Sequence, residues 1–239
     1  MKPFKSRDVQ LHPHESMDSF LDGRLKLIQS RNGYRFSIDA VFLSGFVKVK
    51  PGDILVDLGT GCGIIPLMIL LTKPLGHAFG LEIQRELADQ ALRNSILNGC
   101  GDRLDIIQGD IRCLCVKDKC VDIVICNPPY RKVKSGRINP DSRRAIARHE
   151  LMVSIDDVLK AAGRCLRKKG RLAVSYPAER LMDILTRMRR FNLEPKRVQI
   201  NYPDLQTGGK LVFVEAALGG NPGMEILPPL IGQGNFSVR

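Results

Sequence analysis

A short segment near the middle of the chain carries residues that could act directly on a substrate. An apolar run over residues 121–126 is followed by Asn127, Pro128, Pro129 and Tyr130. The two prolines fix φ and have no backbone N–H, so the turn is stiff and its carbonyl oxygens are free to point at a substrate. We interpret these four residues as a candidate catalytic turn. The alternative is an ordinary proline-rich turn after an edge strand.

A second candidate is the glycine-rich turn at residues 57–63 (DLGTGCG), which follows another apolar run. Gly59, Gly61 and Gly63 permit a tight turn and let a ligand approach the backbone closely. Phosphate-binding and dinucleotide-binding loops share this pattern, so the turn alone is not specific. Glu82 ends the next apolar run, where a carboxylate can accept hydrogen bonds from both hydroxyls of a ribose. The alternative for Glu82 is an exposed charge at the end of a strand.

Asp110 follows a third apolar run, in the segment QGDI. Its carboxylate could accept a hydrogen bond from an adenine amino group. It could also cap the N-terminus of a following helix, and the two roles are compatible.

The segment after the candidate catalytic turn is strongly basic. Between residues 131 and 148 it has one acid, Asp141, and seven cations: Arg131, Lys132, Lys134, Arg137, Arg143, Arg144 and Arg148. We interpret it as a segment that contacts phosphates and becomes ordered on binding. The alternative is a solvated loop.

The composition indicates one α/β domain with a polyanionic partner. Of the 239 residues, 44% are hydrophobic, which is enough for one substantial core. The formal net charge is +12, and clustered Lys and Arg bind phosphates by releasing counterions. The alternative is a basic enzyme whose charge has no specific role.

The apolar runs are too short to cross a bilayer, and no hydrophobic run follows the basic residues of segment 1–10. We therefore expect no transmembrane helix, no secretory signal and a cytoplasmic location. The seven cysteines should then be thiols, because the cytosol is reducing. Cys113, Cys115, Cys120 and Cys126 are close in sequence, but their spacing is unusual for zinc and Cys126 ends a strand. We predict no metal site.

The elements that must position these residues alternate between strand-like and helical patterns. Predicted strands cover 53–58, 77–82, 104–110, 121–127, 171–176, 196–202 and 210–218, and predicted helices cover 38–47, 64–73, 84–99, 178–190 and a segment that begins at Ser154 and runs to 170. Residues 24–29 and 33–37 flank an Asn-Gly turn and predict a hairpin. Alternating strands and helices predict βαβ units on a parallel sheet. The last two strands should pair antiparallel, and no element is predicted in the Gly- and Pro-rich tail.

The motifs DLGTGCG, LE, GDI and CNPPY together resemble the class I S-adenosylmethionine-dependent methyltransferases. Asn-Pro-Pro-Tyr marks the subgroup that methylates planar nitrogens. Segments 25–46 and 139–150 are similar to the bacterial tRNA (adenine) N6-methyltransferase family, which acts on the adenine just 3′ of the anticodon of a valine tRNA. The resemblance covers residues 25–218.

This resemblance implies an α/β, Rossmann-like fold with a mostly parallel seven-stranded sheet. The strand order would be 3-2-1-4-5-7-6 with the seventh strand antiparallel, and the chain would divide into an N-terminal hairpin and helix (1–50), the methyltransferase domain (51–218) and a tail (219–239). S-adenosylmethionine would be the cofactor and S-adenosylhomocysteine the product. The residues expected to bind it are Asp57, Gly59, Thr60, Gly61, Gly63, Glu82, Ile83, Asp110, Ile111 and Asn127.

The resemblance also implies a role for the candidate catalytic turn. The side-chain oxygen of Asn127 and the carbonyl of Pro128 would accept the two N–H bonds of an adenine amino group, and Tyr130 would stack on the base. Tyr130 and Pro129 complete the motif. The partner would be tRNA, with no obligatory protein partner; the oligomeric state stays open.

Other activities use the same motif. Protein-glutamine N5-methyltransferases that act on release factors also carry Asn-Pro-Pro-Tyr, but they usually have a sizeable N-terminal helical domain. Here about fifty residues precede the first core strand. A non-catalytic RNA-binding module is a third possibility, and the intact Gly59, Gly61, Glu82, Asn127 and Tyr130 argue against it.

Overall fold

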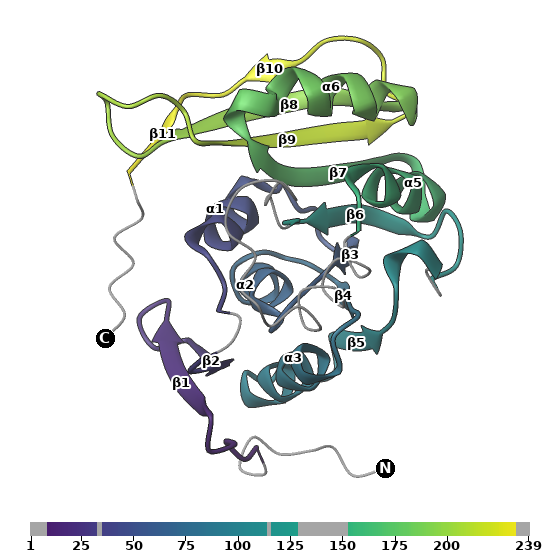
Figure 1. Cartoon of the computed structure of the whole chain (residues 1–239). Coiled ribbons are helices and arrows are strands. Elements are labelled where there is room, and N and C mark those ends of the chain that lie inside the picture. Colours follow the sequence, from purple (N-terminus) through teal and green to yellow (C-terminus); the bar gives the residue numbers. More distant parts are fainter. Residues whose placement is uncertain (1–8, 33–34, 114–115, 129–152, 233–239) are drawn as a thin grey trace, which may run out of the picture.

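The computed structural model describes residues 9–32, 35–113, 116–128 and 153–232. A two-stranded hairpin precedes a large mixed sheet that is covered by helices on both faces (Figure 1). The hairpin consists of β1 (Glu15–Phe20) and β2 (Leu25–Ser30). The core strands are β3 (Ile54–Leu58), β4 (His77–Glu82), β5 (Leu104–Gln108), β6 (Val121–Cys126), β7 (Leu166–Pro177), β8 (Leu193–Tyr202) and β9 (Leu211–Leu218). The helices are α1 (Ile38–Phe46), α2 (Ile64–Thr72), α3 (Arg85–Leu97), α5 (Ile155–Cys165) and α6 (Leu181–Arg190), with the short 3-10 helices η2 (Ile111–Cys113) and η3 (Ala178–Arg180).

The core strands lie in the order β5-β4-β3-β6-β7-β9-β8. Strand β9 is antiparallel to both of its neighbours, and the other pairings among these strands are parallel. This arrangement confirms the predicted order 3-2-1-4-5-7-6 with an antiparallel last strand. Because parallel strands all end at one edge, the carboxyl ends of β3, β4, β5 and β6 lie together there.

Alternate residues of the central strands divide the core between two layers of helices. Leu55 and Ile123 pack in a cluster with side chains of α1 and α2, whereas Val56 and Val124 pack in a cluster with those of α5 and α6. A strand buried on both faces must be apolar at nearly every position. This is why the central strands could be recognised as short continuous apolar runs.

The predicted N-terminal hairpin has a different partner strand and turn. The chain reverses between β1 and β2, where Leu21, Asp22 and Gly23 have φ values of 53°, 54° and 86°. Strand β2 pairs with β1, which precedes it, and residues 35–37 belong to no strand; Gly33 of the predicted Asn-Gly turn lies outside the described residues. Asn98 of α3 accepts a hydrogen bond from Lys26 N–H and donates to its carbonyl, at 2.9 and 2.7 Å. Helix α3 therefore covers the edge of β2 that does not pair with β1.

Two other boundaries differ from expectation. Ser154 and Asp157 form the expected reciprocal capping box at the start of α5, but the helix ends at Cys165 instead of continuing to 170, because Leu166 already pairs with Val121 of β6. In the tail, where no element was predicted, β10 (Glu225–Ile226) and β11 (Leu230–Ile231) pair with β8. None of the helices in the described part of the chain is long and apolar enough to span a membrane.

Candidate active site

The glycine-rich turn connects β3 to α2 at the carboxyl edge of the sheet. Gly59, Gly61 and Gly63 all have positive φ, at 78°, 59° and 85°, and glycine adopts such values without a steric penalty. The N–H groups of Gly59 and Thr60 donate to the carbonyl of Leu81 at 2.8 and 3.0 Å. These bonds hold the turn against the end of β4, beside Glu82.

Packing requires two of the glycines in this region. A Cβ at Gly63 would lie 3.3 Å from the Cβ of Ala91 in α3, and a Cβ at Gly80 would lie 2.9 Å from the methyl carbon of Thr60. Gly80, in the middle of β4, was not singled out from the sequence. A glycine inside an otherwise apolar strand is a signal of close backbone approach that could have identified it.

Glu82 lies at the end of β4 with its carboxylate under the glycine-rich turn. It is buried, so the alternative of an exposed charge at a strand end does not apply. One oxygen accepts the N–H of Gly61 at 2.9 Å and the other accepts the N–H of Gln84 at 2.9 Å. Because each carboxylate oxygen has two acceptor positions, Glu82 can accept further hydrogen bonds from a ligand while it holds the turn.

Asp57 is a fully buried carboxylate with an unmatched acceptor. It is 0% exposed, and its Oδ2 accepts the hydroxyl of Thr60 at 2.7 Å. Its Oδ1 has no hydrogen-bond partner among the described residues. Burial, with a smaller contribution from the charge of Glu82, raises the pKa of Asp57 to about 7. A buried acceptor without a partner costs about 1 to 3 kcal/mol, so the structure favours a ligand that supplies a donor or a positive charge here.

Asp110 was predicted to bind an adenine amino group. In the structure its carboxylate already bonds to Arg112. It accepts the N–H of Arg112 at 2.8 Å and pairs with the Arg112 guanidinium at 2.5 Å. These hydrogen bonds hold the pKa of Asp110 below its ordinary value. Its backbone carbonyl accepts the N–H of Cys113, so the capping alternative is realised at η2. Nearby, Ile111 is buried and Ile83 is half-buried.

Asn127 directly follows β6 and contacts the neighbouring strand β7. Its side-chain oxygen accepts a hydrogen bond from the hydroxyl of Ser175 at 2.5 Å. Ser175 was not predicted as a site residue, because one serine within an apolar strand gives no distinctive signal. Pro128 is the last described residue of the candidate catalytic turn. Pro129, Tyr130 and the basic segment over residues 131–148 lie outside the described residues.

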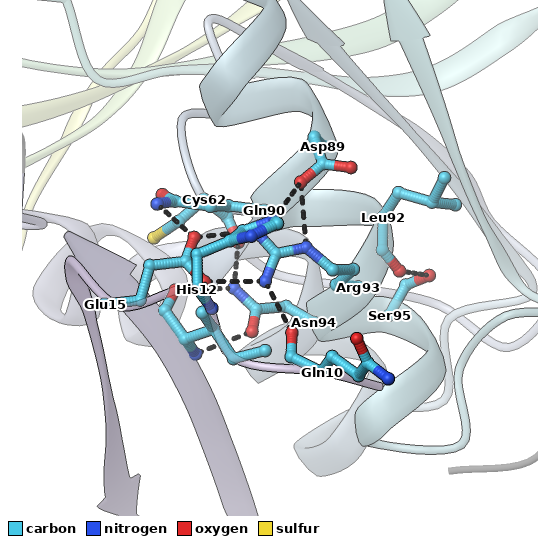
Figure 2. A network of polar contacts seen from close by, with 11 residues as sticks. Gln10, His12, Glu15, Cys62, Asp89, Gln90, Leu92, Arg93, Asn94 and Ser95 are labelled. Atoms are coloured by element: carbon cyan, nitrogen blue, oxygen red, sulfur yellow. Dashed lines mark hydrogen bonds and ion pairs between the residues drawn. The ribbon is translucent and has the colours of Figure 1, made fainter. Parts of the chain in front are cut away.

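A polar network connects the N-terminal hairpin to the glycine-rich turn (Figure 2). Asn94 of α3 is fully buried and exchanges two hydrogen bonds with the backbone of Ile28, at 2.7 and 3.0 Å. The same side chain donates to the carbonyl of Cys62 at 2.9 Å. Although burial opposes ionisation of Glu15, hydrogen bonds led by that from Arg93 lower the pKa of Glu15 to about 2. None of these residues was singled out from the sequence, because their contacts join distant segments.

The cysteines near the site are buried. Cys62 lies in the glycine-rich turn, where burial raises the pKa of its thiol to about 12, and burial also raises the pKa of Cys126 well above its ordinary value. Cys113 is exposed and Cys120 is half-buried, while Cys115 lies outside the described residues. Among the residues that the structure describes, no group of three or more His, Cys, Asp or Glu is arranged to hold a metal ion.

Comparisons with known proteins agree with this geometry. A family described as "Methyltransferase domain" matches residues 49–211. A protein of Porphyromonas gingivalis named tRNA1(Val) (adenine(37)-N6)-methyltransferase is 30% identical over 175 residues, which cover 70% of this chain and 68% of the relative. A protein of the same name from Bacteroides thetaiotaomicron is 28% identical over 164 residues, covering 68% of each chain.

Solved structures show the same fold. A predicted O-methyltransferase from Agrobacterium tumefaciens superposes with a TM-score of 0.65 at 17% identity, covering 80% of this chain and 86% of the other. A putative transferase from Pyrococcus horikoshii gives 0.63 at 13% identity, covering 86% and 72%. At these identities the likeness concerns the fold alone. Together with the matched family and the relatives, it shows that the chain belongs to the class I S-adenosylmethionine-dependent methyltransferases, among relatives named tRNA1(Val) (adenine(37)-N6)-methyltransferases.

Proposed function

We propose that this methyltransferase acts on the exocyclic N6 of an adenine in tRNA, at the position just 3′ of the anticodon in a valine tRNA. The observation that carries the proposal is the side-chain oxygen of Asn127, a hydrogen-bond acceptor held at the carboxyl edge that also carries Glu82 and the glycine-rich turn. The names of the relatives support tRNA as the substrate. We expect the enzyme to act in the cytoplasm without an obligatory protein partner.

The described residues fit the cofactor that the family uses. Glu82 would accept hydrogen bonds from the ribose hydroxyls, and the backbone of Gly59 and Gly61 would allow close approach. The unmatched oxygen of Asp57 suits the positive charge of the methionine portion. Asp110 would accept the adenine amino group by sharing its carboxylate with Arg112. When bound, S-adenosylmethionine supplies an electrophilic methyl group.

The residues at the end of β6 would assist the target nitrogen. An aromatic amine is a poor nucleophile because its lone pair is delocalised into the ring, and its nitrogen gains positive charge as it becomes tetrahedral. The Asn127 oxygen and the Pro128 carbonyl would accept the two N–H bonds and stabilise this charge as it develops. Tyr130 would hold the base by stacking, which contributes about 1 to 3 kcal/mol at comparable platforms. The proton is lost readily once the nitrogen is cationic.

The direct test is a methylation assay with two substrates. The protein is incubated with S-adenosylmethionine and unmodified bulk tRNA, with a release factor as a parallel substrate, and the tRNA is digested for mass spectrometry of nucleosides. We expect new N6-methyladenosine and an unmodified release factor. Methylated release factor with untouched tRNA would replace the proposal with protein-glutamine N5-methylation.

The basic segment is tested separately. Replacing Arg143 and Arg144 with Glu should weaken tRNA binding and flatten its dependence on salt, because fewer counterions are released. The measurement is the tRNA dissociation constant across a salt series, with Arg24 and Lys26 of the N-terminal hairpin replaced by Glu as the charge-matched control. A slope that changes equally in both variants would assign the effect to net charge.

A further inference from the structure

Ser175 occupies the position on β7 next to Asn127. The last pair of the β6–β7 ladder is Cys126–Val174, so Asn127 and Ser175 are the next residues of the two strands. Side chains at the same level of neighbouring strands point to the same face. Ser175 is 0% exposed, and its hydroxyl donates to the oxygen of Asn127.

The rest of β7 makes Ser175 a rigid support. Ser175 pairs with Phe213 of β9, inside a ladder that continues from Arg171 to Pro177. Val174 and Phe213 are both fully buried. Asn127, in contrast, lies just beyond the end of β6 and is half-buried. The hydroxyl therefore connects a side chain at a strand end to a side chain fixed in the middle of the sheet.

A fixed oxygen matters for the proposed reaction. The Asn127 amide can rotate about two side-chain bonds and presents an acceptor on one side and donors on the other. A substrate amino group donates, so it requires the oxygen at a defined place. A carbonyl oxygen has two lone pairs and can accept the Ser175 hydroxyl and a substrate N–H together. We propose that Ser175 is a positioning residue that holds the Asn127 oxygen for the target amine; this inference rests on the proposed function.

The main test separates positioning from simple folding support. Ser175→Ala should lower kcat about tenfold, within the range expected for loss of one hydrogen bond, while the KM for tRNA and the affinity for S-adenosylmethionine stay within about twofold of the native values. Ser175→Cys, which keeps a weak donor, should fall between Ser175→Ala and the native enzyme. Ser44→Ala is the matched control, because Ser44 is a buried serine whose hydroxyl bonds to the carbonyl of Val41 in α1. A native kcat in Ser175→Ala would overturn the proposal.

A double variant tests whether Ser175 acts through Asn127. If it does, Asn127→Ala combined with Ser175→Ala should turn over no more slowly than Asn127→Ala alone, because the side chain to be positioned is already absent. Multiplication of the two single effects would show an independent role and would contradict the proposal.

A spectroscopic measurement decides the question without any RNA. In protein labelled with nitrogen-15 at asparagine, the side-chain amide signal of Asn127 is identified by its loss in Asn127→Ala. This signal should shift in Ser175→Ala and stay in place in Ser44→Ala. If neither tRNA nor release factor is methylated, the proposed function fails. The positioning role is refuted separately, by an Asn127 signal that does not move in Ser175→Ala. If the alanine variant does not fold, the same measurement is made on Ser175→Cys.

Discussion

The two edges of the central sheet carry charges of opposite sign. At the carboxyl edge, Asp57 and Glu82 are both buried acids, and the charge of Glu82 helps to raise the pKa of Asp57. At the amino edge, a hollow of about 590 Å³ is lined by five cations, Lys48, Lys50, Lys73, Arg171 and Arg197. Either edge could be taken for a ligand site from its charge alone.

Most of the cations at the amino edge are held by hydrogen bonds to the backbone. Three of them, from separate elements, donate to five successive carbonyls at the end of α1: Lys73 to Ser44, Gly45 and Val47, Arg197 to Phe46, and Arg171 to Lys48. The last carbonyls of a helix lack intrahelical partners, and the helix dipole attracts positive charge there. The cluster therefore caps α1.

Two of these cations also pair with acids. Asp53 pairs with Arg171 at 2.8 Å, and Glu215 pairs with Arg197 at 3.4 Å. No cation of the described residues pairs in this way with Asp57 or Glu82 at the carboxyl edge. The comparison teaches that hydrogen bonds to the backbone assign most of the amino-edge cations to the fold, whereas the buried Asp57 and Glu82 have no such assignment and are the candidate position for a ligand.

The largest effect should come from Asn127→Ala. Loss of one preorganised acceptor should raise the barrier by roughly 2 to 4 kcal/mol, which lowers turnover roughly 30- to 1000-fold. Affinity for S-adenosylmethionine, measured by calorimetry, should change little, because the side chain acts mainly on the target amine. Retained turnover would remove Asn127 from the mechanism.

Glu82 and Glu215 offer a matched pair across the two edges. Both are buried glutamates, so replacing each with Gln removes the charge and keeps the shape. Glu82→Gln should weaken S-adenosylmethionine binding roughly 10- to 150-fold, since hydrogen bonds to a charged group contribute about 1.5 to 3 kcal/mol. Glu215→Gln should lower the unfolding free energy and leave the dissociation constant unchanged. Equal effects of the two changes on cofactor binding would contradict the assignment of the cofactor to the carboxyl edge alone.

Lys73→Met should act on stability alone. The change keeps an unbranched side chain but leaves three carbonyls of α1 without their donor, which should cost about 1 to 3 kcal/mol of unfolding free energy. Urea denaturation measures this loss. The activity of the folded fraction should equal that of the native enzyme, and a loss of activity at full folding would show that the amino edge has a direct functional role.

The sequence predicted those elements and side-chain positions that depend on a few neighbouring residues. Strand β4 was predicted with its observed bounds, because a short, largely apolar run lies between His77 and Glu82, and the end of that run located Glu82. The same reasoning located Asp57 before a glycine-rich turn and Asn127 after β6. In each case the order of residues along a few positions determines where the side chain lies.

The features that the sequence did not predict depend on contacts between distant segments. Lys26 bonds to Asn98, which lies 72 residues away, so neighbouring residues could not show that a helix would cover one edge of β2. Asn94 and Ser175 were missed for the same reason. Polar residues within a helix or strand become informative only when the fold brings Cys62 or Asn127 beside them.

The smallest expected effect is a dependence of the folding stability on pH. It is also the sharpest test of the buried carboxylate of Asp57. Because the pKa of Asp57 is raised by burial to about 7, the folded state holds its proton more tightly than the unfolded chain. The stability from this group is therefore fully present below about pH 4, the unfolded pKa. It is lost as the pH rises toward 7.

Binding of a cation should act in the opposite direction. If S-adenosylmethionine binds the ionised form of Asp57, its affinity should rise about tenfold between pH 6 and pH 8, because the protonated fraction falls across the pKa. S-adenosylhomocysteine lacks the sulfonium charge and should show a weaker rise, and Asp57→Asn should abolish the difference between the two ligands. An affinity for S-adenosylmethionine that does not change with pH would mean that the Asp57 oxygen is matched by an uncharged donor, and it would remove Asp57 as the partner of the cofactor's positive charge.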